Sequence, residues 1–240
     1  MISVNPSLVA EYKENGVIRV NGLLTFQEVQ SVREALERYE CDLLPQLPKS
    51  DYVLEQDGKS VRNLWRMEQH DEAFKTLAER PDLKQLVSAL VNGTPMPASV
   101  ETFSKPARSG SGVPPHQDNA YFCQNPPDML TVWIAIDPAT LENGPITYCI
   151  GSHRDGLLPH QPSGVAGNSM GLIEIPAKGT YAEFVGILDP GDALIHHCET
   201  IHWSAPNQTQ QSRCGLLFVF CGSHTHTDPS LKADYESARA

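Results

Sequence analysis

The sequence predicts a mainly β protein, an antiparallel sandwich or jelly roll with N-terminal helices packed outside it. Two patterns indicate this fold class. Up to about residue 97 the apolar residues recur every three or four positions, as they do in amphipathic helices. From about residue 98 they form runs of strand length, separated by Gly, Pro, Asn or Asp. Helices that come first and strands that follow favour an antiparallel sheet over alternating βαβ units.

The first part of the chain is expected to contain four helical segments and one strand. Residues 7–15 form a short helix and Val17–Val20 a short strand. Thr25 and Glu28 have the spacing of a capping box, in which each side chain hydrogen-bonds the backbone of the other and a helix begins. Two further helical segments are divided by Pro81, because proline cannot donate the backbone hydrogen bond of a helix interior.

The chain is expected to fold as one domain, residues 1–240, with three parts. Residues 1–97 supply helical support, residues 98–222 form the jelly-roll core, and residues 223–240 are a surface or frayed tail with few apolar residues. Residues 155–182 form a Gly-rich loop that we expect to be a mobile lid. The core strands are predicted at 98–103, 129–136, 145–150, 183–188, 193–198 and 214–220.

The charge of the chain restricts its partners. It carries 29 acidic and 18 basic side chains, a formal net charge of −11. This charge argues against broad electrostatic binding to nucleic acid or to an anionic membrane. It leaves room for an anionic small molecule, because one arginine in a pocket can hold one carboxylate. We therefore expect a small-molecule substrate and no nucleic acid partner.

The cysteines and the N-terminus indicate a compartment. The six cysteines contain no C-x-x-C pair and are expected to be reduced thiols. The first residues show neither a signal-peptide nor a transit-peptide pattern, and no segment approaches the length of a membrane span. We therefore expect a cytoplasmic protein with no membrane partner, and the sequence makes no prediction of its oligomeric state.

The segment Pro114-Pro115-His116-Gln117-Asp118 is the first candidate for chemistry. Residues two apart on an extended chain point to the same face, so we expect His116 and Asp118 to aim an imidazole and a carboxylate at one point. The alternative is a surface loop that happens to contain both residue types. Two ligands do not make a catalytic metal site, and a third must come from elsewhere in the chain.

His202 is the candidate for that third ligand. A hairpin turn at Asn207-Gln208 would place it directly across from Arg213, with Ser204 on the same face. This cation and this hydroxyl can hold the far carboxylate of a ligand whose other end chelates the metal. Two histidines and one carboxylate leave metal positions open, which suits non-haem Fe(II) chemistry with O2, whereas structural zinc sites are closed and usually contain cysteine.

Several neighbouring side chains are expected to have structural roles and not to bind the metal or the substrate. Consecutive strand residues point to opposite sides, so only one of His196 and His197 can face the metal, and we expect it to pack or hydrogen-bond inside the barrel. Tyr121 and Phe122 are expected in the core, with a place in the pocket lining as the alternative. The polar residues ahead of the second helical region are expected to be solvated: Arg62, Asn63 and Arg66.

The stretch from Pro115 to Phe220 is similar to a known family. The resembling pieces are HQDNAYF (116–122), TVWIAID (131–137), ENGPITYCIGSHR (142–154), GDALIHHCETIHWSAPN (191–207) and Arg213. Together they resemble the phytanoyl-CoA dioxygenase family of Fe(II)/2-oxoglutarate-dependent oxygenases. The resemblance implies a double-stranded β-helix, the cupin-like jelly roll, preceded by helices.

The resemblance also implies site residues and cofactors. By this resemblance the presence of Asp118 implies hydroxylation or a related oxidation, because halogenating relatives lack the carboxylate ligand. The implied cofactors are Fe(II), the cosubstrate 2-oxoglutarate and O2. The positions that match the iron ligands are His116, Asp118 and His202. The positions that match the 2-oxoglutarate site are Arg213 and Ser204, at its C5 carboxylate, and Trp133, which lines the pocket.

The function implied is hydroxylation of a C–H bond of a small molecule, with release of succinate and CO2. Two alternatives stay open: a non-catalytic jelly-roll module that binds a metal or a carboxylate, and a cupin-like metal-dependent hydrolase. The substrate also stays open among amino acids, organic acids, organophosphonates, secondary metabolites and acyl thioesters. Its contacts are expected to come from the loops 104–115 and 155–182.

Overall fold

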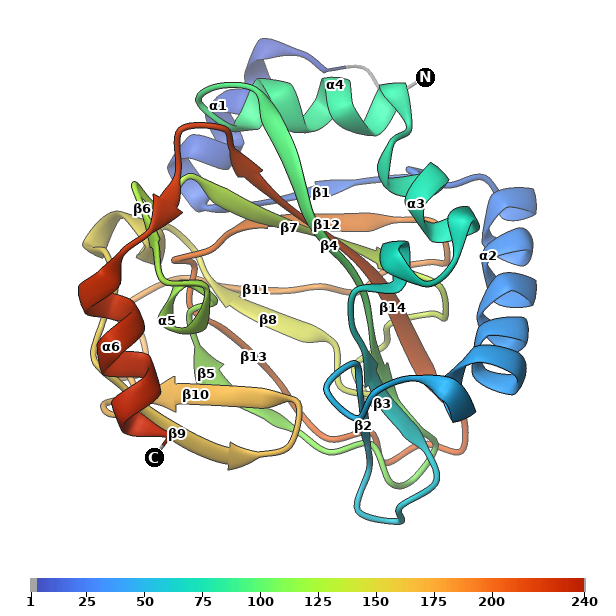
Figure 1. Ribbon diagram of the computed structural model, residues 1–240. Coiled ribbons are helices and arrows are strands. Elements are labelled where there is room, and N and C mark those ends of the chain that lie inside the picture. Colours follow the sequence, from blue (N-terminus) through green and yellow to red (C-terminus); the bar gives the residue numbers. More distant parts are fainter. Residues whose placement is uncertain (1–3, 240) are drawn as a thin grey trace.

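The computed structural model describes residues 4–239 and contains two antiparallel sheets that face each other (Figure 1). The larger sheet has seven strands in the order β1 (Val17–Val20), β12 (Ala193–His197), β7 (Met129–Ala135), β14 (Arg213–Gly222), β4 (Pro95–Lys105), β3 (Val61–Leu64) and β2 (Tyr52–Leu54). The smaller sheet has four strands in the order β11 (Glu183–Val185), β8 (Ile146–Cys149), β13 (His202–Ser204) and β5 (Val113–His116). This architecture is the predicted jelly roll.

Helices accompany the two sheets. The α-helices of the described chain are α1 (Pro6–Asn15), α2 (Phe26–Arg38), α3 (Glu72–Ala78), α4 (Pro81–Leu90), α5 (Asn119–Phe122) and α6 (Pro229–Ala238). Shorter helical turns are η1 (Tyr39–Leu43), η2 (Leu44–Gln46), η3 (Met67–Gln69) and η4 (Ser152–Asp155).

Local sequence signals set the ends of the N-terminal helices as predicted. Thr25 and Glu28 form the capping box that begins α2. Pro81 is the first residue of α4, where its missing N–H costs no helical hydrogen bond. Gly16 ends α1 with a φ of 73°, a left-handed conformation that glycine adopts without steric cost.

The main core lies between the first four helices and the outer face of the larger sheet (Figure 1). Val132 and Ile134 of β7 pack there against the apolar side of α2 and its neighbours. Their alternate neighbours, Thr131 and Trp133, point to the other face, between the two sheets. The helices therefore leave the inner face of the larger sheet available for a site.

The N-terminal part is less purely helical than predicted. The strand β1 was expected, but the hairpin of β2 and β3 was not, and all three strands extend the larger sheet. Two polar residues of β3, Arg62 and Asn63, are buried, so the prediction that they are solvated was wrong. Arg62 is held by an ion pair with Glu55 at 2.8 Å. A strand whose buried residues are polar does not show the apolar alternation by which strands are recognised.

The segment predicted as a Gly-rich lid loop contains a hairpin, so its description as a loop was wrong. The hairpin pairs β9 (His160–Val165) with β10 (Asn168–Leu172). Its two-residue turn is Ala166-Gly167, and Gly167 has a φ of 76°. A tight hairpin turn requires this left-handed conformation, which glycine supplies.

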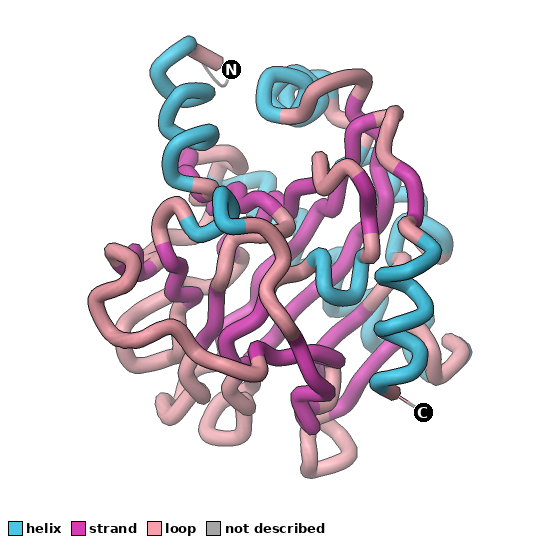
Figure 2. The backbone as a smooth tube through the Cα atoms, turned by 90° about the vertical axis from the view of Figure 1, so that its left-hand side faces the viewer, coloured by secondary structure: helices cyan, strands magenta, loops and turns pink. Residues whose placement is uncertain are grey.

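The tail after residue 222 lies at the surface, as one of the two predicted alternatives had it, but it is structured and not frayed. Its short strand β15 (His226–Thr227) pairs with β6 (Gln124–Asn125). Asp228 then caps α6 by accepting hydrogen bonds from the backbone N–H groups of Ser230 and Leu231. Figures 1 and 2 show α6 beside the β9–β10 hairpin, and Tyr235 of α6 donates a hydrogen bond to Ser169 Oγ at 3.3 Å.

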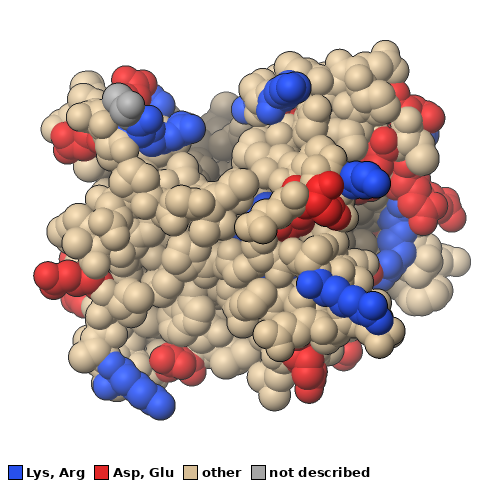
Figure 3. Space-filling model, turned by 90° about the horizontal axis from the view of Figure 1, so that it is seen from below, with Lys and Arg blue, Asp and Glu red and all other residues tan. Residues whose placement is uncertain are grey.

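The surface agrees with the acidic composition. On the face drawn in Figure 3, Lys and Arg side chains are mixed with Asp and Glu and do not gather into one basic field. Among residues 4–239 no helix combines the length and the apolar content that crossing a lipid bilayer requires.

Candidate active site

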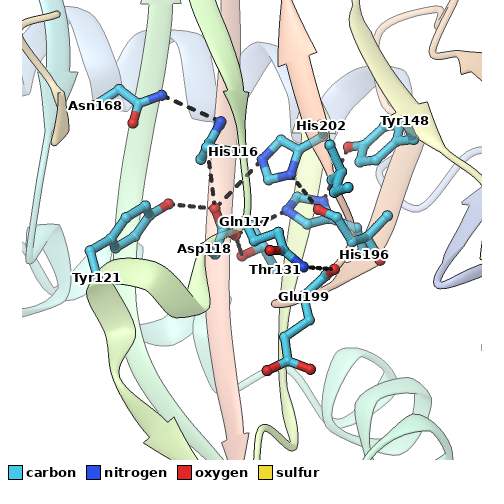
Figure 4. A network of polar contacts seen from close by, with 12 residues as sticks. His116, Gln117, Asp118, Tyr121, Thr131, Tyr148, Asn168, His196, Glu199 and His202 are labelled. Carbon is cyan, nitrogen blue, oxygen red and sulfur yellow. Dashed lines mark hydrogen bonds and ion pairs between the residues drawn. The ribbon is translucent and has the colours of Figure 1, made fainter. Parts of the chain in front are cut away.

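Three side chains from separate elements converge between the sheets (Figure 4). His116 ends β5, Asp118 precedes α5, and His202 begins β13. The Nε2 atoms of His116 and His202 each lie 3.5 Å from Oδ1 of Asp118. All three residues are buried, and one donor atom from each lies within 4.8 Å of the others. The structure thus brings together the three residues that the sequence singled out as metal ligands.

The backbone achieves this convergence differently from the prediction. Asp118 does not continue an extended strand, because its φ of −60° and ψ of −33° are helical. The turn is held by Gln117, a fully buried residue whose amide donates to the carbonyl oxygens of Gly156 and Glu199 and accepts from the N–H of Leu158. Gln117 is a structural residue of the site that sequence reasoning missed.

The two imidazoles are oriented with their Nε2 atoms toward Asp118. Nδ1 of His116 lies 2.9 Å from the carbonyl oxygen of Pro114, and Nδ1 of His202 lies 2.9 Å from that of Thr200. A carbonyl oxygen only accepts, so Nδ1 carries a proton in both rings, and Nε2 is the nitrogen of each ring that is available to bind a metal. This is the tautomer in which a histidine binds a metal through Nε2.

The carboxylate of Asp118 is held ionised. Burial alone would raise its pKa, but His202, His116 and His196 together outweigh burial and lower the pKa well below its usual range. Burial and the neighbouring His116 lower the pKa of His202, which keeps this imidazole neutral. An ionised carboxylate beside the neutral imidazole of His202 is the protonation state in which these two side chains bind a metal.

Other side chains fix Asp118 from outside the ligand set (Figure 4). Nε2 of His196 lies 3.2 Å from Oδ2 of Asp118, and the Thr131 hydroxyl donates to the same oxygen at 3.3 Å. The Tyr121 hydroxyl donates to Oδ1. The prediction that one of His196 and His197 hydrogen-bonds inside the barrel is confirmed for His196.

The residues expected to hold the cosubstrate line the same cavity. A cavity of about 790 Å³ between the sheets contains the three candidate ligands together with Trp133, Ser204 and Arg213. The guanidinium carbon of Arg213 lies 4.8 Å from the centre of the Trp133 ring, within the range of a cation–π contact. Arg213 also donates a hydrogen bond of 2.5 Å to the carbonyl oxygen of Gly144.

The predicted hairpin between His202 and Arg213 was wrong. His202 pairs with His116 and Tyr148 in the smaller sheet, whereas Arg213 pairs with Lys105 in the larger sheet. The polar turn between them crosses from one sheet to the other. Both side chains reach the same cavity because each sheet contributes its inner face.

The surroundings of Arg213 fit an anionic ligand. The guanidinium is fully buried, its Nε has no hydrogen-bond partner, and within residues 4–239 no carboxylate forms an ion pair with it. Burial lowers the pKa of Arg213 to about 10, so the group remains a cation. A buried cation without an anionic partner is costly, and the C5 carboxylate of 2-oxoglutarate would supply that partner.

A buried lysine, Lys105, lies near Arg213 and was missed by sequence reasoning. Its Nζ donates to the carbonyl oxygen of Ser111 at 2.6 Å. Burial, with smaller effects from Arg213 and Arg62, lowers the pKa of Lys105 to about 6. The sequence did not predict that Lys105 is buried, because a lysine at the end of a strand is normally exposed to solvent.

Replacing Lys105 by methionine is expected to stabilise the protein most at and below about pH 6, and progressively less as the pH rises toward about 10. Between the folded pKa of about 6 and the unfolded value of about 10.4, the unfolded chain binds the extra proton, so wild-type stability rises with pH. The slope is at most about 1.4 kcal/mol per pH unit. Urea denaturation at several pH values, with the exposed Lys178→Met as control, measures this. A pH-independent difference for Lys105→Met would contradict the shift.

Gly215 makes room for the ring of Trp133 and was also missed by sequence reasoning. It lies on β14 across from Ala135 and Phe103, and a Cβ at this position would overlap the indole ring of Trp133. Gly215→Ala is therefore expected to displace Trp133 and to cost about 1–3 kcal/mol of stability. It should also weaken 2-oxoglutarate binding, measured by calorimetry. Unchanged affinity together with unchanged stability would show that Trp133 is not held as described.

Four other residues named in the sequence analysis line the cavity. Tyr121 and Phe122 line the cavity, which was the alternative interpretation. Asn63 and Arg66 line it as well, and Arg66 is ion-paired with Asp51.

The sequence of this chain is similar to those of known proteins. The sequence model of the family Phytanoyl-CoA dioxygenase matches residues 12–215. A mouse phytanoyl-CoA dioxygenase domain-containing protein 1 is 24% identical, over 89% of this chain and 88% of its own. The L-proline trans-4-hydroxylase of Streptomyces griseoviridis is 26% identical, over 87% of this chain and 83% of its own. The human peroxisomal phytanoyl-CoA dioxygenase is 24% identical, over 90% of this chain and 68% of its own.

Solved structures share the fold. EctD from S. alaskensis with bound Fe superposes with a TM-score of 0.77 at 17% identity, over 91% of this chain and 77% of its own. The non-haem α-ketoglutarate-dependent epimerase SnoN of nogalamycin biosynthesis has a TM-score of 0.76 at 21% identity, over 97% and 88%. Because the family model matches most of this chain, residues 12–215, the chain belongs to the phytanoyl-CoA dioxygenase family.

Proposed function

We propose that this protein uses Fe(II), 2-oxoglutarate and O2 to convert a C–H bond of a small molecule into C–OH, with release of succinate and CO2. The proposed iron ligands are His116, Asp118 and His202. Two imidazoles and one carboxylate leave the other metal positions open for a chelating cosubstrate and O2. The observation that carries the proposal is that this ligand set shares one cavity with the buried Arg213.

The cosubstrate is proposed to place its C5 carboxylate at Arg213 and Ser204, beside Trp133. A guanidinium can hold a carboxylate through two parallel hydrogen bonds, which fixes both its position and its orientation. When bound, Fe(II) and 2-oxoglutarate supply the activation of O2 and the two electrons that oxidative decarboxylation to succinate provides.

The protein's own side chains orient and shield this chemistry. His196, Thr131 and Tyr121 hold the carboxylate of Asp118 in one orientation, which fixes which metal positions stay open. The backbone carbonyls at Nδ1 of His116 and His202 fix the two ring planes. Burial of all three ligands limits the access of water to the site.

The substrate is proposed to be a small molecule that reaches the metal through this cavity. The net charge of −11 supports a small molecule over nucleic acid as the partner. The six cysteines are all unpaired, which supports action in a reducing compartment such as the cytoplasm.

The test is succinate formation by the purified protein with a panel of small molecules. We expect succinate release that requires Fe(II), 2-oxoglutarate and O2 together, and that a true substrate stimulates. Product formation without 2-oxoglutarate would favour a metal-dependent hydrolase instead. Metal and 2-oxoglutarate binding with no turnover, coupled or uncoupled, would favour a non-catalytic binding module.

A further inference from the structure

The inner face of β4 carries a carboxylate into the same cavity. The register of β4 against β14 pairs Lys105 with Arg213 and Glu101 with Leu217. Residues of even spacing share one face of a strand, so Glu101 points to the same side as Lys105. Glu101 lines the cavity together with the candidate metal ligands.

Glu101 lies well away from Arg213, the cation that is proposed to hold 2-oxoglutarate and that pairs with Lys105 across the strands. Four residues separate it from Lys105 along β4, a distance of roughly 13 Å at the rise of a strand. The cavity therefore has a cation, Arg213, at one end and the carboxylate of Glu101 further along. A substrate beside the metal meets this second part of the cavity, because the first part is assigned to the cosubstrate.

Among the residues that the structure describes, no basic side chain forms an ion pair with Glu101. No Lys, Arg or His of residues 4–239 lies within ion-pair distance of its carboxylate, and the cation in its neighbourhood, Arg66, is paired with Asp51. Two further acids lie in its surroundings, Asp118 and Glu68. Burial raises the pKa of Glu101 to about 7, against a smaller lowering by the Ser99 hydroxyl.

Aromatic rings accompany this carboxylate in the lining. Trp65, Tyr121 and Phe122 all contribute to the cavity wall, and the last two rings meet edge to face with centroids 4.8 Å apart. The negative face of an aromatic ring attracts a cation, and it does so more strongly in a desolvated site. The cavity wall thus contains both a carboxylate and aromatic rings, the two kinds of group that bind an ammonium ion.

We propose that the substrate carries a cationic nitrogen and that Glu101 binds it, which presents a carbon of the same molecule to the metal. This inference rests on the proposed function, since it assigns the other end of the cavity to 2-oxoglutarate. Glu101 is then a specificity-determining residue that selects amines over alcohols and acids of the same shape.

The experiment compares three probes of equal chain length, hexylamine, 1-hexanol and hexanoate. Their binding is measured by calorimetry on the whole protein loaded with Mn(II) and 2-oxoglutarate, at about pH 8, above the pKa of Glu101. The variants are Glu101→Gln, which removes the charge, and Glu101→Arg, which reverses it. The control is Glu79→Gln, which removes an exposed carboxylate outside the cavity.

We expect wild type and Glu79→Gln to bind hexylamine at least about tenfold more tightly than 1-hexanol, as a charge-assisted hydrogen bond implies. In Glu101→Gln this preference should fall below about twofold, and Glu101→Arg should prefer hexanoate. A wild type that binds hexylamine no better than 1-hexanol, or that prefers hexanoate, would overturn the proposal. So would a Glu101→Gln variant that keeps the preference for hexylamine.

A parallel titration separates this inference from the proposed function. 2-Oxoglutarate is titrated into the Mn(II)-loaded wild type and into Glu101→Gln without any probe. We expect the two affinities to agree within about threefold, because the cosubstrate is held at Arg213, roughly 13 Å along the strand. If wild type does not bind 2-oxoglutarate, the proposed function fails. If it binds 2-oxoglutarate but shows no amine preference, only the assignment of Glu101 fails.

Discussion

Replacing His202 by alanine is expected to abolish Fe(II)-dependent consumption of 2-oxoglutarate while the protein stays folded. The proposed ligand set has three members, and no other group of three potential ligands occurs in the part of the chain that the structure describes. Loss of a residue that merely orients a ligand costs about 10- to 100-fold in metal affinity or activity. Loss of a ligand itself should exceed that, and the same holds for His116→Ala and Asp118→Ala.

Two neighbouring histidines supply graded controls for this result. His197→Ala should keep turnover, because the His197 ring faces His153, away from the metal site. His196→Ala should lose about 10- to 100-fold, since His196 contacts Asp118 without being a proposed ligand. Metal titration, succinate release and circular dichroism are measured on each variant. If His202→Ala kept wild-type iron affinity while His197→Ala lost it, the assignment of the third ligand would be wrong.

Arg213→Leu is expected to raise the apparent KM for 2-oxoglutarate by about 30- to 1,000-fold, which corresponds to about 2–4 kcal/mol. The guanidinium is fully buried beside Trp133, where its bond to a carboxylate is little weakened by water. Fe(II) binding should change little, because Arg213 is not among the three candidate ligands. Arg213→Lys should recover only part of the affinity, since an ammonium lacks the planar fork of donors.

The controls for Arg213 distinguish cosubstrate binding from a structural role. Ser204→Ala should cost about 1 kcal/mol, because it removes one neutral donor. Arg38→Leu removes an arginine that pairs with Asp71 at the surface and should leave the 2-oxoglutarate titration unchanged. A calorimetric titration compares all of these variants with wild type. Lower thermal stability of Arg213→Leu with an unchanged 2-oxoglutarate titration would assign Arg213 a structural role instead.

The sequence predicted best what local chemistry determines. The start of α2 follows from the capping box of Thr25 and Glu28, and the start of α4 follows from Pro81. The strands of the jelly roll follow from apolar runs, because β7 and β12 are buried on both faces. These signals lie within a few residues of the structure that they specify, so a single chain reveals them.

The candidate ligands were found for a partly wrong reason. His116 and Asp118 do converge, but through a helical turn at Asp118 and not along an extended strand. His202 and Arg213 do line one cavity, but from two different sheets and not across one hairpin. Residue types and the family resemblance identified the side chains, whereas the path of the backbone depends on pairing between distant segments.

The structural features that the sequence did not reveal depend on long-range contacts. Gln117 is a buried residue whose hydrogen-bond partners lie about 40 and 82 positions away. The helix α6 carries an N-terminal capping signal at Asp228, but its sparse apolar residues concealed it. Glu101 lies on a strand of mixed polar and apolar residues, and only the three-dimensional structure shows that it lines the cavity.

The most direct measurement of the central claim is an anaerobic titration of 2-oxoglutarate into the Fe(II)-loaded protein, followed by visible absorption. Fe(II) and 2-oxoglutarate bound to each other at this site would give a charge-transfer band, so the band would report metal and cosubstrate bound together. We expect a band that saturates at one equivalent in wild type, is absent in His202→Ala, and needs a far higher 2-oxoglutarate concentration in Arg213→Leu. A wild type without the band, or a band unaffected by both substitutions, would contradict the account of this site.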